Sequence, residues 1–158
     1  MGSGVVSTLG LQSCQAFYRE RGFLLALLAG GMFWLTLALT MPVSPVSWPQ
    51  LLSWQFVSLA LAQPCIEECL FRGALQGAVK RCTWGQRAWH GCTSANVIVS
   101  LLFMVGHWWQ HPPLWALAVL LPALLFGWLR DRYDSVYPPM TLHAVYNTGY
   151  FWLTGLPI

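Results

Sequence analysis

The sequence predicts an all-α fold, a polytopic transmembrane bundle of five to six helices. Only 8% of the 158 residues are charged, whereas 56% are hydrophobic and 15% are aromatic. Soluble domains carry about 25% charged residues, so this chain has too few charges to cover a water-facing surface. Its apolar runs approach the ~20 residues that a helix needs to cross a bilayer, and the length allows one domain.

Proline-rich and charged segments separate the expected crossings. The first crossing runs from Phe23 to Met41, after Arg19-Glu20-Arg21 and before a loop rich in proline. The second is expected at residues 51–79, where Pro64 should kink or restart the helix. The others are expected at residues 95–109, 114–129 and 138–155, with a polar loop at 80–94 and a charged loop at 130–134. We expect residues 1–22 to form an N-terminal segment with an interfacial helix within residues 1–18, and residues 23–158 to form a single intramembrane domain.

The basic residues predict the orientation of the chain in the membrane. Loops 42–49 and 110–113 contain no Lys or Arg, while the loops on the other side hold every cation outside the predicted crossings. Cytoplasmic loops carry the excess of Lys and Arg, so we expect a multi-pass protein of the cell inner (cytoplasmic) membrane with its N-terminus in the cytoplasm. The net charge of +3 is small and the cations form no stripe, which argues against a nucleic-acid partner. These cations are Arg19, Arg21, Lys80, Arg81, Arg87, Arg130 and Arg132.

Three ionisable residues interrupt the second crossing. A charged side chain near the bilayer centre costs at least ~2.5–3.5 kcal/mol, so such groups usually have a partner or a function. Glu68 and Arg72 are four residues apart and share a helix face, where they can pair. Glu67 is rotated by ~100° from Glu68, which leaves its carboxylate free for chemistry.

Further polar residues occur in two later crossings. His143 and Asn147 are four apart and share a face, and His107 lies in another helix. Lys80 and Ser94 bound the same predicted cytoplasmic loop. At ~1.5 Å per residue, Glu67 lies ~20 Å from Lys80 and His107 lies ~20 Å from Ser94, so the two side chains lie at the same depth in the membrane. His143 is only ~7 Å past the expected start of its helix. We expect residues 134–138 to enter the membrane as extended chain, which would bring His143 closer to the depth of Glu67 and His107.

These residues match the needs of peptide hydrolysis inside a membrane. Glu67 and His107 can hold and activate a water molecule, with the carboxylate as general base. His143 and Asn147 can donate hydrogen bonds to the developing oxyanion. Such a site requires no serine, cysteine, metal or other cofactor.

Three motifs in this order resemble those of the CAAX-protease and bacteriocin-processing family of glutamic intramembrane endopeptidases. They are Glu67-Glu68-x-x-x-Arg72, Phe103-x-x-x-His107 and His143-x-x-x-Asn147, and the resemblance covers about residues 51–154. It implies that Glu67 and His107 activate water and that His143 and Asn147 form the oxyanion hole. Glu68, Arg72 and Phe103 would support the site.

The resemblance also bears on the substrate. The chain is shorter than the eukaryotic prenyl-protein proteases of that family. Small bacterial members that it is similar to process membrane-anchored partners, including proteins with a C-terminal sorting helix. We therefore expect a membrane-anchored protein or peptide substrate.

Two other functions use the same residues. Glu67, His107 and His143 would be sufficient ligands for a catalytic zinc ion, although the sequence contains no H-E-x-x-H motif. Buried Glu and His also form proton relays, so a non-catalytic carrier or immunity protein is a third interpretation.

Overall fold

A computed structural model describes residues 9–14, 16–109 and 112–157 of the chain. Within these residues the fold is helical, as the sequence predicts, apart from a short hairpin that pairs β1 (Ala88–Trp89) with β2 (Cys92–Thr93) in antiparallel fashion. The helical elements are η1 (Phe17–Arg19), α2 (Arg21–Thr40), α3 (Trp48–Leu51), α4 (Trp54–Val57), η2 (Ser58–Ala62), α5 (Gln63–Glu68), η3 (Cys69–Gln76), α6 (Gly77–Val79), α7 (Ser94–Trp108), α8 (Pro113–Tyr133) and α9 (Tyr137–Thr154).

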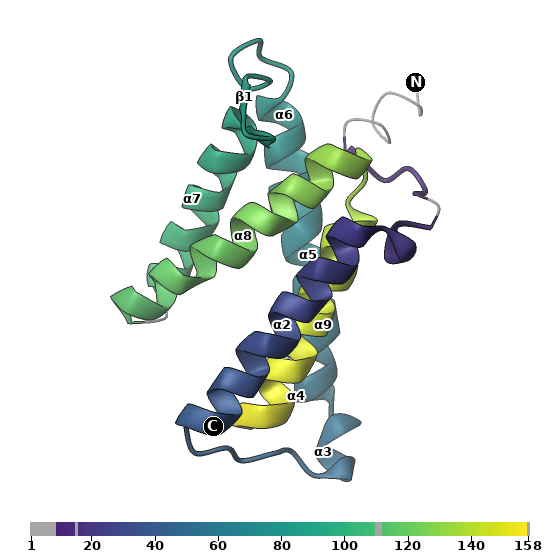
Figure 1. Cartoon of the computed structure of the whole chain (residues 1–158). Helices are drawn as coiled ribbons and strands as arrows, with labels where there is room; N and C mark the ends of the chain where they lie inside the picture. The colour runs from purple at the N-terminus through teal and green to yellow at the C-terminus, as the bar shows by residue number, and fades with distance from the viewer. Residues whose placement is uncertain (1–8, 15, 110–111, 158) are drawn as a thin grey trace.

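The helices form two groups that meet toward one end of the molecule (Figure 1). α2, α9 and the elements from α4 to α6 run side by side as a column, in which α2 and α5 both contact α9. α7 and α8 pack against each other and lean away from the lower part of that column. The two groups join where η3 contacts α7 and where α8 contacts α9. The segment that carries the Glu67-Glu68 pair therefore lies at the centre of the fold.

The elements from α4 to α6 form one continuous helical rod, residues 54–79, which we call the motif rod. The residues at its internal junctions keep right-handed helical backbone angles. The backbone stays helical through Pro64, because η2 widens into a π turn in which the Gln63 N–H donates to the Ser58 carbonyl. Proline lacks an N–H and its ring crowds the carbonyl four residues earlier, so a wider turn accommodates it.

The ends of three helices agree closely with the predicted crossings. α2, α7 and α9 begin and end within two residues of the predicted ranges 23–41, 95–109 and 138–155. α8 differs, because the prediction ends it at Leu129 and assigns a charged loop to residues 130–134. The helix instead continues through Tyr133.

Ion pairs explain the extra turn of α8. Arg130 is buried and its Nη1 lies 2.7 Å from the Asp134 carboxylate, while Lys80 Nζ lies 3.0 Å from Asp131. Although burial acts to raise the pKa of Asp134, the hydrogen bond and charge of Arg130 hold that pKa below its ordinary value. Asp134 then ends the helix in the left-handed conformation, with φ of 49°.

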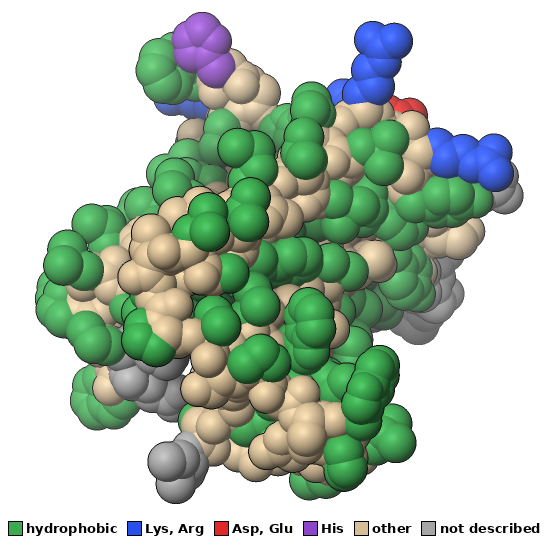
Figure 2. Space-filling view, turned by 60° about the horizontal axis from the view of Figure 1, so that its bottom comes forward, with side chains coloured by type: hydrophobic (Ala, Val, Ile, Leu, Met, Phe, Trp, Pro, Cys, Tyr) green, Lys and Arg blue, Asp and Glu red, His purple; other side chains and the backbone are tan. Residues whose placement is uncertain are grey.

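The exterior of the molecule is largely apolar. Two helices in the described part of the chain, α2 and α8, are long enough and apolar enough to cross a membrane, and α7 is a shorter apolar helix. Figure 2 shows hydrophobic side chains over most of one face, with Lys and Arg confined to one edge. Large exposed apolar surfaces of this kind mark contact with lipid or with a partner.

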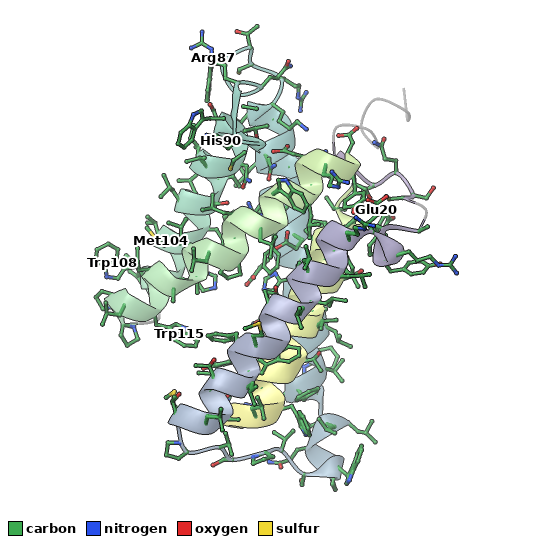
Figure 3. The ribbon with its side chains drawn as sticks, viewed as in Figure 1. Glu20, Arg87, His90, Met104, Trp108 and Trp115 are labelled. Atoms are coloured by element: carbon green, nitrogen blue, oxygen red, sulfur yellow. The ribbon has the colours of Figure 1, made fainter. Side chains whose placement is uncertain are left out.

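Charged side chains from distant segments gather at one end of the molecule. Arg132 pairs with Glu20 at 3.1 Å, and Lys80 pairs with Asp131 as described above. Figure 3 shows Glu20 and Arg87 at this same end, where α2 begins and the hairpin lies. We call this the charged end.

The N-terminal segment crosses the turn between α8 and α9 at the charged end. The Gly10 carbonyl accepts a hydrogen bond of 2.9 Å from the Val136 N–H, and the Gln12 amide donates to Asp134. Gly10 has φ of 65°, and a Cβ at this position would collide with the Arg130 guanidinium. The segment is thus held by backbone contacts that favour glycine.

The interfacial helix predicted within residues 1–18 falls partly on residues 1–8 and 15, which lie outside the described residues. In the described remainder of that range, helical structure is confined to the start of η1 and a single helical residue at position 9.

Glycines allow close approach of α2 to α9. A Cβ at Gly30 would collide with the Tyr146 ring, and one at Gly149 would collide with Trp34. The Tyr146 hydroxyl donates a 2.6 Å hydrogen bond to the Ala26 carbonyl, so the two helices are also joined by a polar contact.

A third glycine lets α8 approach α7. A Cβ at Gly127 would overlap the side-chain amide of Asn96, which is fully buried and donates to the Leu124 carbonyl at 2.9 Å. The amide therefore reaches the backbone of α8 only because position 127 has no side chain.

We expect Gly127→Ala to destabilise the fold by about 1–3 kcal/mol, because the buried Asn96 amide cannot move without losing its hydrogen bonds. The matched control is Gly31→Ala in α2, where nothing lies within 4 Å of the added Cβ. The control should be neutral, or more stable by about 0.5–1 kcal/mol, because alanine favours helix. Thermal unfolding followed by circular dichroism in detergent measures both, and equal melting temperatures would contradict this packing.

Candidate active site

The two glutamates of the motif rod have different environments. Glu68 is fully buried, and its Oε2 lies 3.3 Å from Nε of Arg72, which is also fully buried. The Glu67 side chain keeps 31% of its exposure. The structure thus contains the predicted Glu68–Arg72 ion pair and leaves Glu67 partly open.

Arg72 is held by further contacts that the sequence analysis missed. Its Nη1 donates to Ser100 Oγ at 3.2 Å, and Ser100 in turn donates to the Asn96 side chain at 2.9 Å. The guanidinium also lies over the Phe103 ring, 5.6 Å from its centroid. Asn96 and Ser100 are polar residues four apart in an apolar helix, and that spacing is the signal that could have identified them.

His143 lies between the two glutamates. Its Nδ1 is 2.9 Å from Glu68 Oε1, and its Nε2 is 3.8 Å from Glu67 Oε2. The ring stacks on Phe126 with centroids 4.7 Å apart and planes at 21°. The first α9 residue of the predicted site therefore contacts both carboxylates of the motif rod.

Residues 134–138 do not form the extended entry that the sequence predicts, because Asp134 is left-handed, Val136 has helical angles and α9 begins at Tyr137. The depth of His143 has a different cause. Val136, just before α9, packs against the motif rod at Gly73, where a Cβ would lie 3.6 Å from Val136 Cγ1. Gly73 is seven residues before Lys80, so α9 begins ~10 Å deeper than the end of the rod. His143, seven residues past Val136, therefore reaches the level of Glu68.

His107 is oriented by its own helix. Its Nδ1 lies 2.9 Å from the Phe103 carbonyl oxygen, which can only accept, so Nδ1 carries the hydrogen. In the neutral ring, Nε2 then holds the lone pair and can accept a proton. The Phe103 ring packs on His107 with centroids 4.5 Å apart and meets the edge of His143 at 6.1 Å. One phenylalanine thus contacts both imidazoles.

Asn147 also faces the motif rod, one turn beyond His143. Its Nδ2 donates to the Leu59 carbonyl at 3.1 Å. Within a π turn this carbonyl would accept from the residue five positions later, which is Pro64 and has no N–H. Asn147 therefore supplies a hydrogen bond that the proline removes. His143 and Asn147 do share a face, but their hydrogen bonds go to different parts of the rod.

The arrangement has the components of a hydrolytic site. A partly exposed carboxylate, Glu67, lies within electrostatic range of His143 and His107. Among the residues that the structure describes, no three His, Cys, Asp or Glu side chains are grouped as metal ligands.

The sequence matches the Rce1-like family, the type II CAAX prenyl endopeptidases, over residues 49–149. The chain belongs to this family. The match includes the motif rod, α7, α8 and most of α9, and so every residue of the predicted site, whereas α2 lies outside it. No match was found among curated proteins or among solved structures.

Membership of the Rce1-like family confirms the resemblance seen in the three motifs. Proteins of this family are membrane-embedded endopeptidases of the CAAX type, so the chain is a protease by family. The Glu-Glu-x-x-x-Arg segment lies inside the matched region, on the rod that contacts both groups of helices.

We expect Glu68→Ala to destabilise the protein by about 3–5 kcal/mol, because Arg72 would keep a buried charge without its partner. The double variant Glu68→Leu with Arg72→Met should recover much of this loss, since apolar residues of similar volume often replace a buried ion pair without cost. Folded yield and thermal unfolding in detergent measure both variants. If the double variant were as unstable as Glu68→Ala, the lost charge balance would not be the cause.

Proposed function

We propose that this protein is a glutamic-type intramembrane endopeptidase that hydrolyses a peptide bond of a membrane-anchored protein. The observation that carries the proposal is the unequal state of the two glutamates. Glu68 forms a buried ion pair with Arg72, while Glu67 stays partly exposed, with its Oε2 3.8 Å from His143 Nε2. A carboxylate that is not neutralised by a buried arginine can act as a general base.

In this proposal Glu67 and His107 hold the attacking water. Glu67 removes its proton, and His107 receives a hydrogen bond from the water at Nε2. The contact of His107 Nδ1 with the Phe103 carbonyl supports this role, because it fixes the tautomer that presents a lone pair at Nε2. Proton abstraction then needs a water within about 2.6–3.2 Å of the carboxylate.

His143 and Asn147 stabilise the tetrahedral oxyanion. While Nδ1 of His143 donates to Glu68, Nε2 can donate to substrate oxygen when the ring is an imidazolium. An amide nitrogen carries two hydrogens, so Asn147 can donate one to Leu59 and one to the oxyanion. Donors fixed in this way before the reaction cost no reorganisation as charge develops.

The chain would cross the membrane five times, as α2, the motif rod, α7, α8 and α9, with residues 23–158 as one domain. The charged end would face the cytoplasm of the cell inner membrane, because cytoplasmic loops carry the basic residues. Exposed tryptophans lie at both ends, as expected at the two membrane interfaces: Trp89 in the hairpin at the charged end, and Trp48 in α3 and Trp54 in α4 at the other. The substrate would be a membrane-anchored protein, such as one with a C-terminal sorting helix.

We expect Glu67→Gln and His107→Ala each to lower the cleavage rate by about 10²–10⁴-fold, the usual contribution of general acid–base catalysis. Their folded yield should match the parent protein, since neither residue belongs to the buried ion pair. Glu20→Gln at the charged end is the matched control and should retain activity.

The assay uses purified protein in proteoliposomes with two substrates, a prenylated CAAX-type peptide and a reporter anchored by a C-terminal transmembrane helix. Full activity of Glu67→Gln on the cleaved substrate would rule out the proposed base. Cleavage of the prenylated peptide alone would refute the sorting-helix substrate.

A zinc-dependent reaction is the second candidate, because His143 Nε2 and Glu67 Oε2 are 3.8 Å apart and could both bind one zinc ion. Under the proposed mechanism, dialysis against 1,10-phenanthroline should leave the cleavage rate unchanged. Activity that disappears with the chelator and returns on adding zinc, together with stoichiometric zinc by elemental analysis, would favour the metal instead.

A further inference from the structure

Phe126 makes the closest aromatic contact of His143. The two rings are stacked, with centroids 4.7 Å apart and planes at 21°, whereas Phe103 meets the same imidazole edge-on at 75°. Phe126 is 2% exposed and lies on α8, outside the three motifs that define the site. It therefore covers one face of the imidazole from a helix to which the sequence assigns no role.

Two buried amides hold the backbone on either side of Phe126. Asn96 of α7 donates to the Leu124 carbonyl at 2.9 Å, and Gln76 of the motif rod donates to the Gly127 carbonyl at 3.0 Å. Asn96 and Gln76 are both fully buried. Since each extra bond comes from a neighbouring helix, the stretch of α8 that carries Phe126 is fixed relative to both of them.

The stack restricts the freedom that His143 would otherwise keep. The hydrogen bond from Nδ1 to Glu68 fixes one point of the imidazole but permits the ring to swing about it. A flat ring held against its face removes that swing. With both contacts present, Nε2 keeps its direction toward Glu67 and toward any substrate oxygen beside it.

We propose that Phe126 is a positioning residue that fixes the plane of the His143 imidazole for catalysis. The inference rests on the proposed function, in which His143 donates to the oxyanion from Nε2. A displacement of a catalytic group by about 1 Å can cost 100-fold in rate, so the loss of the stack should reduce kcat rather than substrate binding.

The test compares Phe126→Leu with Phe23→Leu. Both phenylalanines belong to the same core cluster and are 2% exposed. Phe23 contacts the Phe17 ring, whereas Phe126 contacts His143 and, at 5.7 Å, Tyr146. Phe126→Leu should lower kcat by about 10–100-fold at nearly constant KM. Phe23→Leu should stay within about twofold of the parent rate, and Phe126→Tyr, which keeps the ring, should restore most of the activity.

A second measurement, by NMR, detects the stacking of Phe126 on His143 independently of catalysis. The imidazole proton signals of ¹³C-labelled histidine, with His143 assigned through His143→Gln, should move in Phe126→Leu and remain in place in Phe23→Leu. Phe126→Met serves in both measurements if the leucine variant does not fold.

The outcomes separate this inference from the proposed function. Equal kcat for Phe126→Leu and Phe23→Leu, or an unmoved His143 signal, would overturn the positioning role. Full activity in both Glu67→Gln and His143→Gln would instead overturn the proposed function, whether or not the His143 signal depends on Phe126.

Discussion

The buried pair of Glu68 and Arg72 is the interaction on which the rest of the site depends. Two charges that are removed from water are stable only when geometry and further hydrogen bonds compensate their desolvation. Here the compensation comes from two other helices, through Ser100 of α7 and His143 of α9. The pair therefore joins three helices, and it also makes the adjacent glutamate chemically distinct.

The same interactions build the fold and the site. The buried amide groups of Asn96 and Gln76 donate to carbonyls of α8, and those bonds fix the helix that presents Phe126 to His143. The Leu59 carbonyl, which Pro64 leaves without a backbone donor, receives Asn147. Buried polar groups are costly unless satisfied, so each of these bonds limits how far the helices can shift.

The sequence predicted what depends on local geometry. The Glu68–Arg72 pair follows from helical spacing alone, and three helices end within two residues of the predicted positions. The depth of His143 was explained wrongly, since it depends on Val136 docking at Gly73, a contact that spacing does not encode. Phe126 was missed for the same reason: a phenylalanine in an apolar helix looks like any core residue until the partner of its ring is known.

The N-terminal segment has a consequence for how the protein is made. Gly10 and Gln12 dock on residues 134–136, which leave the ribosome more than a hundred residues later. This segment must therefore wait, undocked, while the helices between are synthesised and inserted. Its docking against Arg130 can close only after α8 and the turn that follows it are in place. The contacts of Gly10 and Gln12 with residues 134–136 would thus be among the last to form during biogenesis.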